Sequence, residues 1–186
     1  VKLFIFLNLK KINFICQAID ILLNNIYTLV IENNLEVIMF NFSNTIQFQD
    51  KINDVFTIGE ILVDMISDDY DTNFNSNKYS RFFGGSPANI TMNIKRLGGN
   101  PIITACVGND GLGKFLINHL KNNNIDTNLI NSVNHSTSMV LVTKSKETPL
   151  PIFYRSADYN LEYNSDIDST LKNSKIVHFS CWPISQ

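Results

Sequence analysis

The sequence predicts an α/β protein in which helices flank a parallel sheet and a small β appendage stands beside it. Short runs rich in β-branched residues alternate with segments of helical periodicity, and glycines mark where both kinds of segment end. Such alternation favours a parallel sheet with the helices outside, because parallel strands need long crossover connections. Two further strand-like runs enclose a short polar turn, which predicts a separate hairpin.

The first strand is predicted over residues 55–63, where β-branched and aromatic side chains form one buried run. A polar stretch over 67–78 follows, and its clustered acids lack the spacing of a calcium-binding EF-hand loop. We therefore expect a solvated loop there. Residues 79–83 form a second predicted strand, which leads directly into Gly84 and Gly85.

A helix is predicted to follow these glycines. Ser86 has the side chain of an N-cap, and Pro87 suits the first helical position, where its missing N–H costs nothing. The periodicity carries the helix to Leu97 and predicts that Ile90, Ile94 and Leu97 form its buried face.

The remaining segments continue the alternation. The predicted elements are a strand over 101–107, a helix over 111–120, hairpin strands over 139–143 and 151–155, a short helix over 166–172 and a buried strand over 176–180. Three aromatic side chains, Phe82, Phe83 and Phe153, could offer a stacking surface to a nucleobase, but we expect them to pack in the core.

Composition excludes several classes of function. The formal net charge is −2 and lysines are scattered singly, so no basic stripe predicts nucleic-acid binding. The three cysteines lie far apart and show no metal-ligand spacing, as expected of reduced thiols in a cytoplasmic protein. Charged residues interrupt the apolar stretch over 1–40, so it lacks the roughly 18 uncharged residues of a spanning helix and no membrane partner is expected.

The first fifty residues differ in sequence pattern from the rest. We divide the chain into an uncertain leader over 1–50 and a domain over 51–186. The first methionine is Met39, and our hypothesis is that translation starts there and that the preceding residues are upstream sequence read in frame. An amphipathic helical extension is the alternative for these residues.

The segment from Gly108 to Gly113 has the glycine spacing of a phosphate-binding P-loop. However, Phe115 stands where a P-loop needs a hydroxyl for magnesium, and Asp110 would place a carboxylate against the phosphate. We therefore predict a structural turn in which Asp110 caps the following helix.

The other glycine motif is a better candidate for a binding site. Gly84 and Gly85 allow a ligand to approach the backbone closely, and the Asn89 amide can both donate and accept hydrogen bonds. These groups suit a neutral polyhydroxylated ligand, whose hydroxyls also donate and accept. From these residues alone, the alternative that Asn89 only satisfies the start of the helix stays open.

Taken together, the motifs resemble the ribokinase-like (PfkB-type) carbohydrate kinases, and among them the fructokinases and their near relatives. The resemblance covers Asp54 to the last residue. Its motifs are Gly59-Glu60-Ile61-Leu62-Val63-Asp64, Gly84-Gly85-Ser86-Pro87-Ala88-Asn89 with Arg96-Leu97-Gly98, Val107-Gly108-Asn109-Asp110-x-x-Gly113, and Tyr154-Arg155-Ser156-Ala157-Asp158. The resemblance implies a three-layer sandwich with a mostly parallel central sheet and a small β lid, formed here by segments near 66–83 and 137–156.

The resemblance also implies roles for particular residues. Asp64 would bind sugar hydroxyls, since an ionised carboxylate forms strong charge-assisted hydrogen bonds. Gly84, Gly85 and Asn89 would form the floor of the sugar pocket. Arg155, on the lid hairpin, would reach over the sugar from above.

The implied activity is ATP-dependent phosphorylation of a sugar's primary hydroxyl, with Mg²⁺ as cofactor. The family's catalytic aspartate lies in a Gly-Ala-Gly-Asp segment and its magnesium-holding Glu in an Asn-x-x-Glu segment, and neither segment occurs in this chain. We therefore expect the catalytic base and most of the ATP site beyond Gln186, no metal ligand within the chain, and an inactive polypeptide if the chain is an incomplete part of a kinase.

Several substrates and one other class of function stay open. Fructose is the first expectation, with 2-keto-3-deoxygluconate and 5-dehydro-2-deoxygluconate as alternatives because Arg155 could pair with a carboxylate. A nucleoside kinase of the same fold would need a base-stacking pocket. The alternative from another class is a non-catalytic fragment that binds sugar or dimerises, and a homodimer through the β lid is a further expectation.

Overall fold

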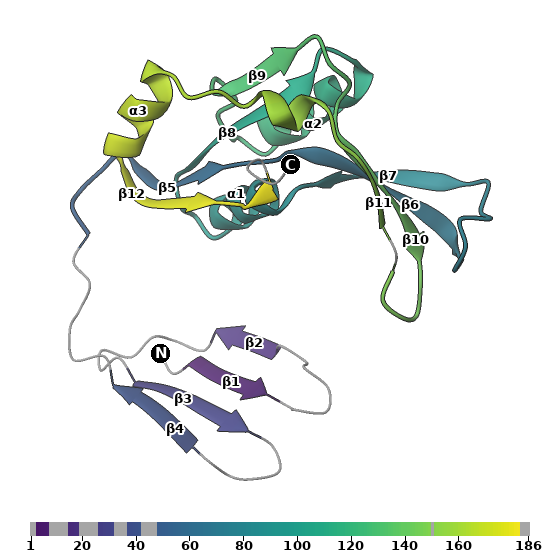
Figure 1. Ribbon diagram of the computed structural model, residues 1–186. Helices are drawn as coiled ribbons and strands as arrows, with labels where there is room; N and C mark the ends of the chain where they lie inside the picture. Colours follow the sequence, from purple (N-terminus) through teal and green to yellow (C-terminus); the bar gives the residue numbers. More distant parts are fainter. Residues whose placement is uncertain are drawn as a thin grey trace. The chain divides into compact units, whose positions relative to one another are not determined.

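The computed structural model describes residues 3–7, 15–18, 26–31, 37–41, 48–149 and 151–182. The chain divides into two compact units, Val1–Phe48 and Gln49–Gln186. The first contains a four-stranded sheet of order β2-β1-β3-β4, with strands β1 (Leu3–Leu7), β2 (Ile15–Ala18), β3 (Ile26–Ile31) and β4 (Val37–Asn41) (Figure 1). The alternative of a helical extension is therefore wrong for these described residues, and the start-site hypothesis at Met39 stays a prediction.

The second unit is built around a parallel sheet of order β12-β5-β8-β9 (Figure 1). Its strands are β5 (Asn53–Ile58), β8 (Pro101–Gly108), β9 (Ile130–Val133) and β12 (Ser174–Phe179). The parallel sheet expected from the strand–helix alternation is confirmed. Strand β9 was not expected, because it has four residues and only Ile130 is fully buried in it.

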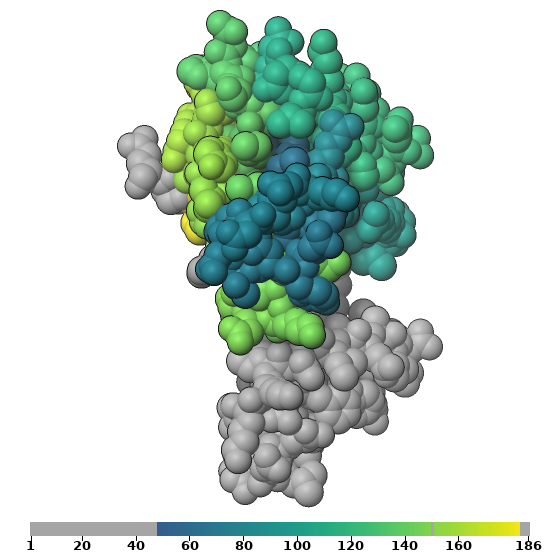
Figure 2. Space-filling view, turned by 90° about the vertical axis from the view of Figure 1, so that its right-hand side faces the viewer, coloured from purple at the N-terminus to yellow at the C-terminus, as the bar shows by residue number. Residues whose placement is uncertain are grey.

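A second four-stranded sheet, which we call the lid sheet, has the order β11-β10-β6-β7. Its strands are β6 (Leu62–Tyr70), β7 (Tyr79–Gly84), β10 (Met139–Lys144) and β11 (Pro151–Tyr154). Strands β6 and β10 pair in parallel, and the two outer strands pair antiparallel to them, so the expected hairpin is confirmed as β10–β11. Figure 2 shows the blue-teal β6–β7 segment beside the green β10–β11 segment at the surface.

Helices cover both faces of the parallel sheet. The helices are α1 (Ser86–Arg96), α2 (Gly111–Asn122), α3 (Ser165–Lys172) and the 3₁₀ helix η1 (Ala157–Asn160). Helices α1 and α2 share one core cluster with Ile103, Ala105 and Val107, which alternate along one face of β8. On the opposite face of β8, the Cys106 thiol donates to the Asn160 carbonyl in η1 at 3.0 Å. Among the described residues, no helix is both long and apolar enough to span a bilayer.

The prediction of a single first strand over 55–63 is wrong. The run is divided between β5 in the parallel sheet and β6 in the lid sheet, with Gly59, Glu60 and Ile61 between them. At Gly59 the φ angle is +151°, and an added Cβ would lie 2.5 Å from the Ser180 hydroxyl and 2.6 Å from Pro87. The glycine thus lets the chain leave one sheet and enter the other. The expected loop over 67–78 is also shorter, because β6 continues through Tyr70.

Helix α1 departs from its prediction at its start and on its face. Its N-cap is Gly85, and Ser86 is the first helical residue rather than the cap. The side chains buried on its inner face include Ala88, Thr91 and Met92, whereas Leu97 is 87% exposed. Thr91 belongs on the buried face because its hydroxyl bonds the Pro87 carbonyl and the Thr57 hydroxyl, which a reading of apolar residues alone does not detect.

Burial also corrects two other predictions. Phe83 packs against the core, but Phe82 is 49% and Phe153 is 54% exposed, so these two are not core residues. Strand β12 was expected to be buried, yet it lies at the edge of the parallel sheet with Phe179 66% exposed.

Candidate functional site

A cavity of about 670 Å³ lies where β6, the start of α1 and the lid sheet meet. Its polar side chains come from β6, from the connection between β5 and β6, and from α1, and its apolar side chains come largely from the lid hairpin and the segment after β12. The lining side chains with polar atoms are Glu60, Asp64, Ser86, Asn89 and Asn93, and the apolar ones include Val140, Phe153 and Trp182. Among the described residues that line it, none is a lysine or arginine.

Asp64 lies in the middle of the lid sheet. Its neighbours in register are Phe82 on β7 and Val140 on β10, and Val140 in turn faces Phe153 on β11. Burial raises the pKa of the Asp64 carboxyl above its usual value. A Cβ at Gly84 would overlap this carboxylate, so Gly84 provides the space in which Asp64 lies.

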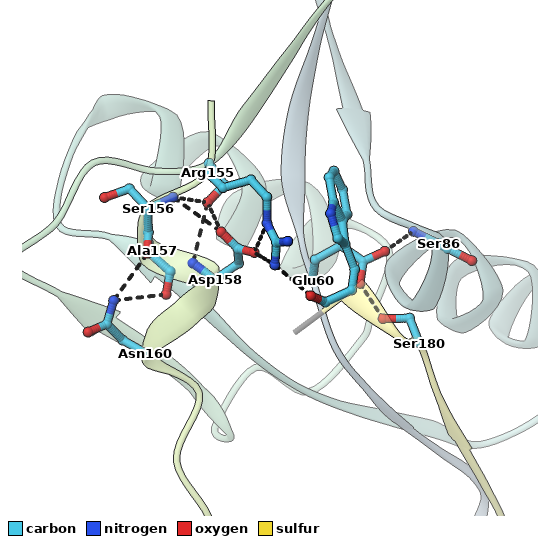
Figure 3. Close-up of polar contacts among 10 residues, drawn as sticks. Glu60, Ser86, Arg155, Ser156, Ala157, Asp158, Asn160 and Ser180 are labelled. Carbon is cyan, nitrogen blue, oxygen red and sulfur yellow. Dashed lines mark hydrogen bonds and ion pairs between the residues drawn. The ribbon is translucent and has the colours of Figure 1, made fainter. Parts of the chain in front are cut away.

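Glu60 is a site residue that the sequence interpretation missed. It is 3% exposed, and its carboxylate accepts a hydrogen bond from the Ser86 N–H at 3.1 Å and another from the Ser180 hydroxyl (Figure 3). Gly85 has no side chain to cap α1, so Glu60 supplies the acceptor for the first free amide. The sequence signal that could have identified Glu60 is an acidic residue between a strand-ending glycine and a second apolar run.

Gly85 and Asn89 both line the same cavity as Asp64. Gly85 has a φ of +102°, and an added Cβ would lie 2.5 Å from the Glu60 carbonyl oxygen, so only glycine fits there. The N-cap residue Gly85 makes no side-chain cap bond, and the Ser86 N–H is bonded to Glu60. The exposed Asn89 amide therefore does not satisfy the helix start and is available to a ligand.

Arg155 lies outside this cavity and lines a neighbouring one of about 680 Å³ with Arg81, Asp110 and Tyr154. Its Nε and Nη2 atoms donate to the Asp158 carboxylate at 2.8 and 2.6 Å, and Nη2 also donates to the Trp182 carbonyl at 2.6 Å (Figure 3). Arg155 thus does not line the predicted sugar pocket itself, but it contacts Trp182, which does.

The Gly108–Gly113 segment is a structural turn, as predicted. The Asp110 carboxylate accepts hydrogen bonds from the Gly113 N–H at 2.8 Å and from the Thr137 N–H at 2.8 Å. Burial tends to raise the pKa of Asp110, but the bonds from Thr137 and Gly113 outweigh it and lower the pKa. A Cβ at Gly113 would overlap the Gly108 carbonyl oxygen, so the turn also requires glycine.

The residues described do not fit ATP phosphates or Mg²⁺. Across 48–149 and 151–182, no group of three or more His, Cys, Asp or Glu side chains could hold a metal ion. The amide that a phosphate would use at the start of α2 is bonded to Asp110 instead. We therefore derive no phosphoryl-transfer step from these residues.

Curated relatives point to sugar kinases. The chain is 57% identical over 148 residues to an ATP-dependent 6-phosphofructokinase of Thermoanaerobacterium thermosaccharolyticum, over 80% of this chain and 46% of the relative. It is 30% identical over 142 residues to a 5-dehydro-2-deoxygluconokinase of Clostridium botulinum, over 73% of this chain and 42% of the relative. The chain thus spans about half the length of the curated relatives it matches.

Solved structures confirm the fold class. The fructokinase of Halothermothrix orenii matches with a TM-score of 0.66 and 38% identity, over 72% of this chain and 48% of that one. A putative ribokinase II from E. coli matches with a TM-score of 0.62 and 28% identity, over 69% and 42%.

A match to a family covers most of the second unit. Residues 52–184 match the family described as pfkB family carbohydrate kinase. Because this range is more than half of the chain and holds the parallel sheet, the lid sheet and the cavity beside the lid sheet, the chain belongs to the pfkB family of carbohydrate kinases.

Proposed function

We propose that the full-length protein transfers a phosphoryl group from ATP to a hydroxyl of a fructose-type sugar. The observation that carries this proposal is the single cavity that gathers Asp64, Gly85 and Asn89. These residues come from two motifs about twenty positions apart, and together they offer acceptors and donors for neighbouring hydroxyls. Gly84 contributes indirectly, since it leaves room for the Asp64 carboxylate.

The finer choice is between fructose and fructose 6-phosphate. The 57% identity to a 6-phosphofructokinase supports fructose 6-phosphate. The fructokinase structure at 38% identity supports fructose, as does a cavity whose described lining carries Glu60 and Asp64 but no cationic side chain. A phosphate on the acceptor would have to lie away from both carboxylates, because like charges repel strongly in a partly buried site.

Acidic sugars are the second candidate. The 30% identity to a 5-dehydro-2-deoxygluconokinase supports 5-dehydro-2-deoxygluconate, and 2-keto-3-deoxygluconate stays with it as an alternative. The same two carboxylates disfavour both compounds. Arg155 does not offset this repulsion within the cavity, because its guanidinium lines the neighbouring one and is paired with Asp158.

The test is ADP release by the full-length protein with ATP, Mg²⁺ and each of these four compounds in turn. We expect the highest kcat/KM with fructose or fructose 6-phosphate. Asp64→Asn should lower it at least about tenfold, since a charge-assisted hydrogen bond contributes roughly 1.5–3 kcal/mol. The control is Asp69→Asn, an exposed aspartate farther along the same strand.

Two outcomes would contradict the proposal. One is the absence of ADP release with every sugar despite calorimetric binding, which would favour the non-catalytic fragment or sugar-binding protein. The other is equal loss of activity in the Asp64 and Asp69 variants, which would remove Asp64 from the site. The homodimer through the lid sheet stays a prediction, and sedimentation of the same protein tests it.

A further inference from the structure

We propose that Phe153 and Trp182 form an aromatic wall that packs against the C–H face of a sugar in ring form, and that Arg155 is the positioning residue that holds this wall. The inference rests on the proposed function, because it concerns the same cavity. It adds a substrate class, a cyclic sugar with an apolar face, and it gives Arg155 a role other than direct contact with the sugar.

The two sides of the cavity differ in chemistry. Asp64 and Asn89 line it with polar atoms, whereas Val140, Phe153 and Trp182 line it with apolar surface. A sugar ring has the same division, because its hydroxyls project from the edge and its axial C–H bonds form an apolar face. Ligand pockets commonly combine an aromatic lining with a few polar groups that fix orientation.

The lid sheet sets the separation between the two sides. Asp64, Val140 and Phe153 are successive partners in register on β6, β10 and β11, so their side chains project from the same face of the sheet. Two strand spacings, about 10 Å, separate the backbones of Asp64 and Phe153. This leaves room for one ring between the carboxylate and the aromatic side chain, above the small Val140.

The aromatic side chains support each other at this position. The rings of Phe153 and Trp182 meet edge to face, with centroids 5.3 Å apart and an interplanar angle of 81°. This is a favoured geometry for aromatic pairs. Phe153 is 54% exposed, so part of its ring is accessible to a ligand in the cavity.

Arg155 fixes the tryptophan by two contacts. Its guanidinium lies 4.9 Å from the Trp182 ring centroid, and its Nη2 donates to the Trp182 carbonyl at 2.6 Å. A second ring, that of Tyr159, lies 4.2 Å from the guanidinium. The planar guanidinium can stack and donate at the same time, which a lysine ammonium cannot do.

Asp158 in turn fixes Arg155. Their side chains are 1% and 11% exposed, and the pair is joined by two hydrogen bonds. The other Asp158 oxygen accepts from the Ser138 hydroxyl and the Ser156 N–H (Figure 3). Ser138 immediately precedes β10 and Ser156 follows β11, so this network ties the base of the lid hairpin to Trp182.

The experiment uses the 186-residue chain, in which Trp182 is the only tryptophan, so selectively excited tryptophan emission reports this wall without the six tyrosines. The probes are fructose, which forms rings, and sorbitol, an open-chain polyol with the same kinds of hydroxyl. We expect fructose to change the emission saturably, with a dissociation constant by calorimetry that agrees. Sorbitol should bind more weakly, because it has no fixed C–H face.

The variants separate the wall from general effects on the lid sheet. Phe153→Leu, which keeps apolar volume, should weaken fructose binding up to about tenfold, and Phe153→Tyr should restore it. Phe82→Leu is the matched control, because Phe82 is similarly exposed in the same row of the sheet but does not line the cavity. Arg155→Lys should shift the emission maximum of the free chain and weaken fructose binding while circular dichroism stays unchanged.

The failures can be told apart. If the 186-residue chain binds no sugar although the full-length protein releases ADP with fructose, the wall is overturned and the proposed function stands. If the full-length protein releases no ADP either, both are overturned. If fructose binds and Asp64→Asn weakens binding, but Phe153→Leu has no more effect than Phe82→Leu, only the wall is overturned. If Arg155→Lys changes neither emission nor affinity, the positioning role of Arg155 is wrong.

Discussion

At the scale of single residues, Asp64 shows how a binding group opposes stability. Its carboxyl is half-buried among apolar neighbours on the lid sheet, and burial raises its pKa. The folded chain therefore holds this proton more tightly than the unfolded chain, whose aspartates have a pKa of about 3.9. The contribution of Asp64 to stability is greatest below that pH and is lost as the pH rises through the raised folded value.

We predict that Asp64→Asn stabilises the chain while it weakens sugar binding. The amide removes the cost of an ionised group in a partly buried site, so Tm at pH 7 should rise by about 1–3 °C, a small change because the side chain is only half-buried. The difference should disappear below about pH 3.9, where both side chains are neutral. Thermal scans at pH 7 and pH 3 measure this, with Asp69→Asn as the exposed control, and a lower Tm at pH 7 would contradict it.

At the scale of elements, Asp110 joins helix α2 to the segment that precedes the lid hairpin. It caps α2 through Gly113 and accepts two hydrogen bonds from Thr137, at 2.8 Å from its N–H and 2.7 Å from its hydroxyl. The net lowering of its pKa means that the ionised form is favoured in the folded chain. Its contribution is thus present above the unfolded value of about 3.9 and is lost as the pH falls through the lower folded value.

Asp110→Ala should therefore destabilise the chain by about 2 kcal/mol at pH 7, from the lost cap and the two unpaired donors of Thr137. The loss should shrink as the pH falls below about 3.9, since the wild-type carboxyl is then protonated. Urea unfolding at both pH values measures the difference. As a control, Asp126→Ala removes an exposed carboxylate that caps only a turn, at 2.8 Å from the Asn128 N–H, and it should cost less than about 0.5 kcal/mol.

The elements that the sequence predicted well are those with local signals. Glycines and Asn123 mark the ends of α1 and α2, and the short polar turn marks the lid hairpin. The wrong predictions concern features that depend on tertiary contacts. Nothing local in the run over 55–63 reveals that its halves pair with different sheets, and the buried face of α1 depends on a Thr91 partner from β5.

The same distinction between local signals and tertiary contacts applies to the candidate site. Asp64, Gly85 and Asn89 could be predicted because they lie in recognisable motifs, and the structure places all three around one cavity. The other side of the cavity could not be predicted, because Phe153 and Trp182 look like ordinary core residues in the sequence. Their position follows from the register of β11 on β10 and from the contacts of Arg155.

At the scale of the whole molecule, strand β12 places three exposed apolar residues at one edge of the parallel sheet. Strand β12 pairs with β5 on one side only within the described sheet. Ile176, Val177 and Phe179 on this strand are 44%, 41% and 66% exposed. An exposed apolar edge strand offers unpaired backbone groups and a template for another chain, so this edge is the expected site of self-association.

We predict that Phe179→Lys reduces concentration-dependent association of the 186-residue chain, because natural edge strands use lysine to oppose pairing. Sedimentation velocity over a range of concentrations measures the effect, and the monomer fraction should rise. Leu97→Lys is the matched control, since it places the same charge at an 87% exposed apolar position at the end of α1, away from the sheet edge. If both substitutions raise the monomer fraction equally, net charge explains the change. If only Phe179→Lys does, β12 is the associating edge, and pairing at that edge also competes with the binding of any further strand there.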